Sequence, residues 1–136
     1  MKPKYEWLKI RNVFTDEYVL DDNGEFFSWE ENIPNGWYKA FGKQMIEELN
    51  CILIKYNYAD KYRIVQIKEK FGTIRWYDNG IPIKADKEYW DWLDKYEKLS
   101  GETCILCGDK STHFKKGWVC PLCDKCDIGG NQNEQM

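Results

Sequence analysis

The residues with the clearest chemistry in this sequence are cysteines near its C-terminal end. Five of the six cysteines fall within residues 104–126, in the stretch TCILCGDKSTHFKKGWVCPLCDKC. Two residues between paired cysteines let a tight turn point both sulfurs at one ion, and two such pairs across a short loop are typical of zinc ribbons. Because thiolates favour zinc or iron over magnesium or calcium, the pattern predicts one structural zinc ion.

The sequence offers five cysteines for four ligand positions. Cys104 and Cys107, followed by a glycine that suits a tight turn, form the first half-site. The second half-site is either Cys120 with Cys123 or Cys123 with Cys126, and the spacing alone leaves both pairings open. His113 is a further candidate ligand, although four cysteines are the better solution.

No catalytic constellation accompanies these cysteines. The chain has a single histidine, no phosphate-binding glycine loop and no nucleophile elbow. Four thiolates also leave no open position on a zinc ion, so the site is expected to be structural and the protein is expected not to be an enzyme. Cys51 lies in a predicted helix without a nearby histidine and is expected to be inert.

The elements that must position the site can be predicted from periodicity. A helix is expected over residues 37–57, where apolar residues recur every three or four positions. Alternating β-branched and aromatic residues predict two antiparallel strands, about 62–70 and 73–78, joined by a turn. A second helix over 87–99 leads into the cysteines, and an N-terminal strand could extend the hairpin. The fold class is therefore α+β, with a helix packed on a β-hairpin.

An isolated two-stranded hairpin is marginal in water, so the first helix should cover one of its faces. Phe71 and Trp76 are accordingly expected to be at least partly buried against Phe41, Met45 and Leu49 of that helix. The chain should divide into an α+β body, a zinc-ribbon-like module and a flexible tail, over 1–100, 101–128 and 129–136.

Composition and charge narrow the classes of partner. The chain has 136 residues, 16% of them aromatic, and a formal net charge of −3, which suits a folded protein and not a generic nucleic-acid binder. It contains no apolar run long enough for a membrane span and no secretion signal, so a cytoplasmic location is expected. A basic surface for nucleic acid could use seven residues: Lys61, Arg63, Lys68, Lys70, Arg75, Lys115 and Lys116.

From Ile67 to Cys126 the sequence resembles a group of small uncharacterised proteins from bacteriophages, prophages and bacteria. The resemblance rests on IKEKFGTIRWY at 67–77, SGETCILCG at 100–108 and GWVCPLCDKC at 117–126. It implies that Cys123 and Cys126 form the second half-site, so the expected ligands are Cys104, Cys107, Cys123 and Cys126. Cys120 departs from the family pattern and would be a buried spare.

The resemblance also implies an origin in a phage or mobile element, where small proteins often bind a host component. Together with the aromatic content and the acidic N-terminal third, it predicts a non-enzymatic, zinc-stabilised protein that binds a host protein, such as a component of a defence system. The alternative is a nucleic-acid-binding zinc ribbon that uses the basic hairpin and ribbon.

Overall fold

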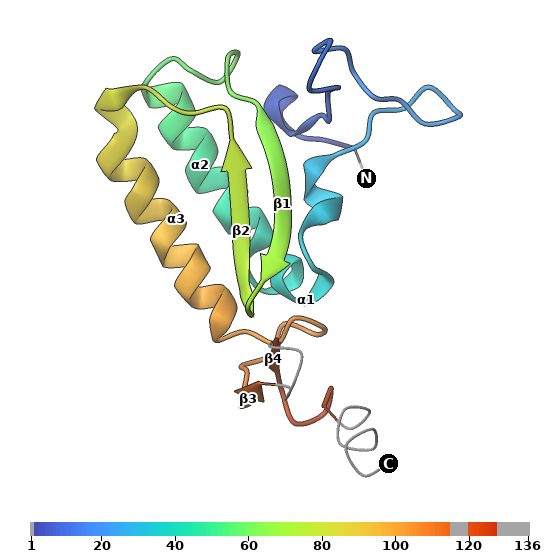
Figure 1. Cartoon of the computed structure of the whole chain (residues 1–136), viewed down its shortest axis with the longest axis vertical. Coiled ribbons are helices and arrows are strands. Elements are labelled where there is room, and N and C mark those ends of the chain that lie inside the picture. The colour runs from blue at the N-terminus through green and yellow to red at the C-terminus, as the bar shows by residue number, and fades with distance from the viewer. Residues whose placement is uncertain (1, 115–119, 128–136) are drawn as a thin grey trace.

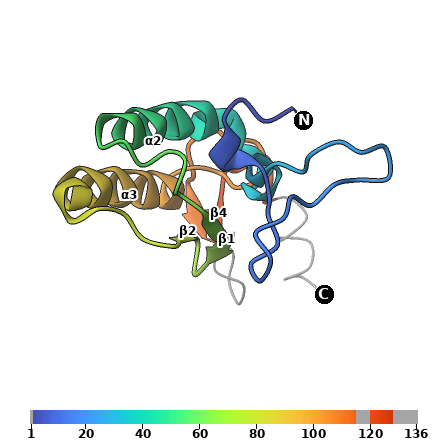
Figure 2. The same ribbon diagram turned by 90° about the horizontal axis from the view of Figure 1, so that it is seen from above.

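The computed structural model describes residues 2–114 and 120–127, except for the side chains of residues 113 and 114. Two long helices, α2 (Lys43–Lys55) and α3 (Asp86–Gly101), accompany an antiparallel hairpin of β1 (Ile64–Lys70) and β2 (Thr73–Asp78) (Figure 1). Seen from above, both helices lie side by side on the same face of the hairpin (Figure 2). The structure thus confirms the α+β fold class. The predicted tail at 129–136 lies outside the described residues.

The first helix begins earlier than predicted and is not uniform. A single turn, α1 (Asn35–Trp37), leads into a π-helical turn over Tyr38–Gly42 and then into α2. Glycine suits position 42 of this wider turn. A Cβ there would lie 2.4 Å from the Tyr38 ring, which is too close for a side chain to fit without a shift. The apolar side chains of this helix therefore enter the core from a segment whose first turns are irregular.

The core includes a run of aromatic rings on α3 and β2. Trp76 packs edge-on against Trp92, with ring centroids 5.3 Å apart, and the Trp92 indole N–H donates to the backbone oxygen of Met45 on α2 at 2.9 Å. Trp76 is buried, as predicted. α3, which was not expected to cover the hairpin, supplies this packing and also caps the edge of β2, where Ser100 Oγ accepts from the Ile74 N–H.

Phe71 contradicts the prediction that it would be buried. It occupies the first position of the two-residue turn between β1 and β2, with φ of 53° followed by Gly72 at 87°. Two positive φ values make this a type I′ turn, which turns the chain at the tip of the hairpin. Phe71 is consequently 69% exposed.

Three Lys–Tyr dipeptides tie the helices to each other and to the N-terminus in the same way. In each, the ammonium and the phenol hydroxyl converge on one glutamate carboxylate. The sets are Lys4 and Tyr5 on Glu47, Lys55 and Tyr56 on Glu88, and Lys95 and Tyr96 on Glu48. Hydrogen bonds from the lysine, and then from the tyrosine, lower the pKa of Glu47 and of Glu88. These three hydrogen-bonded sets lie at the surface, so they orient the helices more than they stabilise them.

Residues 9–28 form an irregular arm that projects from the body on the β1 side (Figures 1 and 2). Isolated bridges join Lys9 to Ser28, Arg11 to Tyr18 and Leu20 to Phe26. The N-terminal segment therefore does not extend the hairpin as a regular third strand, because its pairing breaks after each bridge. Two loop tips result, at 12–17 and at 21–25.

Candidate metal centre

The first pair of cysteines lies on a tight turn directly after α3. The Cys104 N–H donates to the Asp109 carbonyl at 2.7 Å, and the Gly108 N–H donates back to the Cys104 carbonyl at 3.0 Å. Gly108 has φ of 89°, a conformation that L side chains rarely adopt. The glycine after the first pair thus closes the turn that brings Cys104 and Cys107 to the same side.

The second pair follows a short strand. β4 (Pro121–Leu122) pairs with β3 (His113–Phe114), and the Ile105 N–H donates to the Pro121 carbonyl at 3.0 Å. The chain then turns, and the Asp127 N–H donates to the Cys123 carbonyl at 3.2 Å. The two turns therefore face each other across one backbone hydrogen bond from the first cysteine turn to β4.

The structure brings the sulfurs of Cys104, Cys107, Cys123 and Cys126 together, with all four within 4.8 Å of one another. The Cys107 and Cys123 sulfurs are 3.5 Å apart. In a tetrahedral zinc site with Zn–S bonds of about 2.3 Å, the sulfurs lie about 3.8 Å apart. The observed spacing brackets that value, so this donor set fits one tetrahedral metal ion with small side-chain adjustments.

The pKa values of the Cys104 and Cys126 thiols are shifted in opposite directions. Burial acts to raise the pKa of Cys104, but backbone N–H groups of Cys107, Cys123 and Leu106 donate to its sulfur and bring the pKa down to about 6. Burial, followed by the neighbouring thiols, raises the pKa of Cys126. Four thiols this close cannot all ionise without a cation between them, and a divalent ion would remove that repulsion.

The cysteine turns are docked on the start of α1. The Gly36 N–H donates to the Ile105 carbonyl at 2.9 Å, and the Trp37 indole N–H donates to the Thr103 carbonyl at 3.0 Å. A Cβ on Gly36 would lie 2.3 Å from the Cys104 carbonyl oxygen. The structure shows that Gly36 permits this close backbone approach, which the sequence alone did not predict.

The remaining candidate ligands are placed differently. Cys120 is fully buried, but its sulfur is not part of the four-thiol cluster. Cys51 is exposed on α2, far along the chain from the cluster. The side chain of His113 lies outside the described part of the structure. Among the described thiols, the geometry therefore groups Cys123 with Cys126 and not with Cys120.

The five described cations among the seven considered for nucleic acid do not gather into one patch. Lys68 and Arg75 are cross-strand partners on the outer hairpin face, with Lys70 two residues along. Arg75 also pairs with Glu97 on α3 at 3.2 Å, and Arg63 is held by Asp16 of the arm. Lys61 precedes β1, and residues 115 and 116 lie outside the described residues. Of the five candidate cations within the described residues, three therefore share a face.

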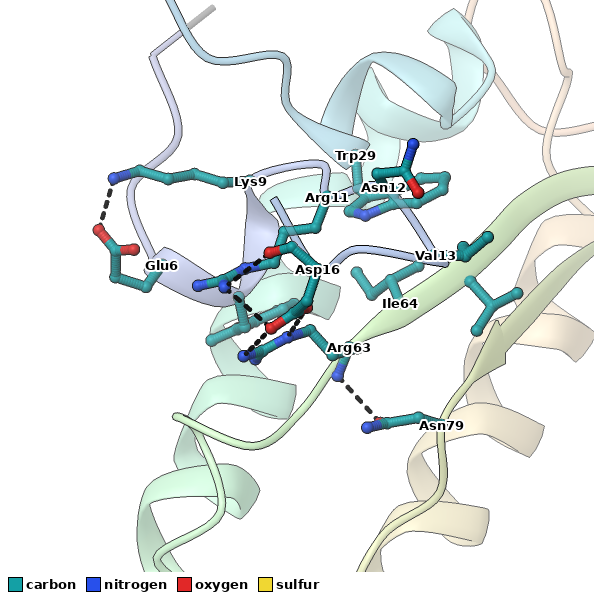
Figure 3. Close-up of a pocket in the computed structure, with 12 residues that line it drawn as sticks. Glu6, Lys9, Arg11, Asn12, Val13, Asp16, Trp29, Arg63, Ile64 and Asn79 are labelled. Carbon is teal, nitrogen blue, oxygen red and sulfur yellow. Dashed lines mark hydrogen bonds and ion pairs between the residues drawn. The ribbon is translucent and has the colours of Figure 1, made fainter. Parts of the chain in front are cut away.

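A pocket of about 250 Å³ lies where the arm meets the start of β1 (Figure 3). Trp7, Trp29 and Ile64 are buried residues of its wall. Its charges are paired with each other: Arg63 Nε donates to Asp16 Oδ1 at 2.9 Å, and Arg11 Nη1 lies 3.3 Å from Asp16 Oδ2. Asp16 has φ of 61°, which aspartate tolerates better than most residues. This pairing could not be predicted from the sequence, because Arg63 and Asp16 are remote along the chain.

No known protein-family model, curated protein or solved structure matches the chain. Within the described residues, no helix is both long and apolar enough to cross a membrane. The function must therefore be inferred from the geometry of the molecule itself.

Proposed function

We propose that the protein is a non-enzymatic binding protein that carries one structural zinc ion and acts by protein–protein contact. Zinc fits the four-thiol cluster because it prefers tetrahedral thiolate coordination and needs no open position in a structural site. Cys104, Cys107, Cys123 and Cys126 would hold it. The ion would fix the two cysteine turns to each other and, through Gly36 and Trp37, to the helical body.

One observation carries the proposal of a protein partner: the arm exposes apolar side chains instead of burying them. Phe14 is 93% exposed and Val13 is 67% exposed, at the tip of one loop. Contiguous apolar surface on a soluble protein commonly marks an interaction site. The resemblance to phage and prophage proteins supports a host protein as the partner, such as a component of a defence system. A reducing host cytoplasm would keep the four thiols available to zinc.

A titration with nucleic acid tests this proposal against the alternative of a nucleic-acid-binding ribbon. The zinc-loaded chain is titrated into labelled random single- and double-stranded oligonucleotides, and fluorescence anisotropy is followed. We expect no strong binding at physiological salt, because among the described candidate cations only Lys68, Lys70 and Arg75 share a face and counterion release needs several phosphate contacts. Tight, salt-sensitive binding that the double variant Lys68→Glu with Lys70→Glu abolishes would replace the protein-binding proposal with the alternative.

A further inference from the structure

We infer that the arm, residues 9–28, is the docking surface, and that it fits a cationic partner with an apolar groove. This inference rests on the proposed function, since it names the surface and the partner chemistry for protein binding. It depends on three features of the arm: apolar side chains that face solvent, carboxylates without counterions, and a fixed connection to the body.

The apolar side chains are spread along both loops of the arm. Phe14 and Val13 form the tip of the first loop, and Leu20 is exposed where the second loop begins. The other partly exposed apolar residues of the arm are Tyr18, Val19, Phe26 and Phe27. Large apolar side chains of this kind, above all aromatic ones, dominate the energetics of protein interfaces when a partner buries them. Phe14 is the natural anchor because its ring has the least cover in the free protein.

The charge along these two loops is mainly negative, although Lys9 and Arg11 at the base of the arm lie over the Phe26 and Tyr18 rings. Between Asn12 and Phe27 the sequence contains five carboxylates and no lysine or arginine. Arg11 and Arg63 pair with Asp16, but no ion pair to a described residue involves the other four: Glu17, Asp21, Asp22 and Glu25. An apolar patch bordered by unpaired carboxylates is complementary to an apolar groove bordered by lysine and arginine.

The arm is held in place before any partner arrives. Figure 3 shows Asp16 between the Arg11 and Arg63 side chains, so one carboxylate links the first loop to the residue before β1. Within that loop the Asn12 side chain accepts from the Phe14 N–H at 2.8 Å. Arg11 also lies over the Tyr18 ring, 4.2 Å from its centroid. Ordering that is completed in the free protein lowers the entropic cost of binding.

A second copy of the chain fits the docking surface of the arm less well than a different protein would. The only described basic face of the hairpin carries Lys68, Lys70 and Arg75, and the arm lies elsewhere on the molecule. That face offers the arm few free cations, because Arg75 already pairs with Glu97 of α3. The net charge of −3 on each copy also opposes such assembly.

Peptide titrations test the inferred chemistry directly. The probe is a fluorescein-labelled 18-residue helical peptide of leucine and lysine, with an apolar stripe, and its counterpart has glutamate in place of every lysine. We expect the zinc-loaded chain to bind the lysine peptide, more weakly as salt rises, and not to bind the glutamate peptide. Phe14→Ser, and separately Asp21→Asn with Asp22→Asn, should each weaken binding roughly tenfold.

Matched variants away from the arm control for loss of apolar surface and loss of charge. Ile83→Ser removes an apolar side chain that is 87% exposed before α3, and Asp91→Asn with Asp94→Asn removes two exposed carboxylates of α3. Both should bind the lysine peptide like the unmodified chain. The inference is overturned if the lysine peptide does not bind at low salt, if the arm and control variants bind alike, or if the glutamate peptide binds as well.

Light scattering after size-exclusion chromatography tests whether a second copy of the chain occupies the arm. We expect a monomer; a stable oligomer that Phe14→Ser dissolves would show that a second copy covers the arm and would overturn the inference. Failure in any of these tests removes the cationic docking surface but leaves protein binding through another face open. Only the nucleic-acid titration bears on the proposed function as a whole, so the two failures can be told apart.

Discussion

The candidate metal centre and the arm of this small molecule differ in how far their side chains are buried and in how their backbone is bonded. At the metal centre the side chains of Cys104, Ile105 and Leu122 are buried, and the backbone of the cysteine turns is bonded to α1. In the arm, Phe14 and Leu20 face solvent, and isolated bridges replace a regular strand ladder. The first region uses its polar backbone groups to fix the fold, whereas the second holds apolar groups away from the core. The difference indicates that the residues that fix the fold and the exposed apolar residues lie in separate regions of the chain.

The largest effect is expected from Cys126→Ser, which removes one of the four clustered thiols. The variant should lose zinc and about 5 kcal/mol or more of unfolding free energy, because metal binding contributes directly to folding in small sites of this kind. Elemental analysis and thermal unfolding measure the two quantities.

Cys120→Ser serves as the matched control for Cys126→Ser and should retain about one zinc per chain. If Cys120→Ser loses the metal and Cys126→Ser keeps it, the second half-site is Cys120 with Cys123. If metal loss leaves the melting temperature of the body unchanged, the cysteine turns do not stabilise the rest of the fold, and the contrast with the arm fails.

Gly36→Ala tests whether the metal centre is joined to the body through close backbone packing. The added methyl would lie 2.3 Å from the Cys104 carbonyl oxygen and 2.6 Å from the Ile105 carbonyl. Since backbone must move, we expect a loss of about 3 kcal/mol in chemical unfolding, the upper end of overpacking effects. Gly101→Ala is the control, because its Cβ would meet only Thr73 Cγ2 at 3.4 Å. Equal stability of the two variants would rule out the tight junction.

The hydrogen-bonded tyrosines of the body predict a loss of stability at alkaline pH. Burial, and then a hydrogen bond to Glu30, raises the pKa of Tyr38 to about 12, and the same causes raise the pKa of Tyr89 beside Asp78 and of Tyr96 beside Glu48. In the unfolded chain these tyrosines lose their protons near pH 10, while the folded state keeps them. Stability is therefore fully present below about pH 10 and falls as the pH rises toward 12.

Urea unfolding at several values between pH 8 and 11.5 checks this expectation. Tyr38→Phe should reduce the alkaline fall, since one of the shifted groups is gone. Phe14→Ser should leave the whole profile unchanged, because the arm contributes contact surface and not stability. A pH-independent midpoint across this range would contradict the assignment.

Arg63→Ala should loosen the arm without unfolding the body. The Arg63–Asp16 pair is partly exposed, and such pairs contribute little to global stability. The local effect should be larger, because this pair links loop 12–17 to the residue before β1. Hydrogen exchange should therefore speed up in residues 12–17 and stay unchanged in α2 and α3. Lys61→Ala, two residues earlier in the chain, is the control and should alter neither region.

The sequence predicted those parts of the molecule that depend on local pattern. Apolar periodicity located the helices and the hairpin, and the spacing of cysteines located the first half-site, whereas the resemblance, and not the spacing, selected Cys123 and Cys126 for the second. The sequence did not predict contacts between residues that are far apart along the chain. Examples are the close approach of Gly36 to Cys104 and the pairing of Arg63 with Asp16. Phe71 was misassigned because strand alternation predicts burial by residue type, whereas the turn geometry turns its ring outward.

The smallest effect, and the only stabilising one, is expected at Phe71. Three non-glycine residues in the described part of the chain have positive φ, and two of them, Asp16 and Asn57, are of types that tolerate it. Phe71 is the exception, in a type I′ turn that favours asparagine followed by glycine. Phe71→Asn should therefore raise the unfolding free energy by about 0.5–1 kcal/mol, measured by urea unfolding, since it relieves backbone strain and gives up little burial. Phe71→Ala should show no such gain, because alanine is also disfavoured at positive φ. A clear loss in both variants would mean that the exposed ring stabilises the fold, and that exposed apolar residues here are not reserved for contact.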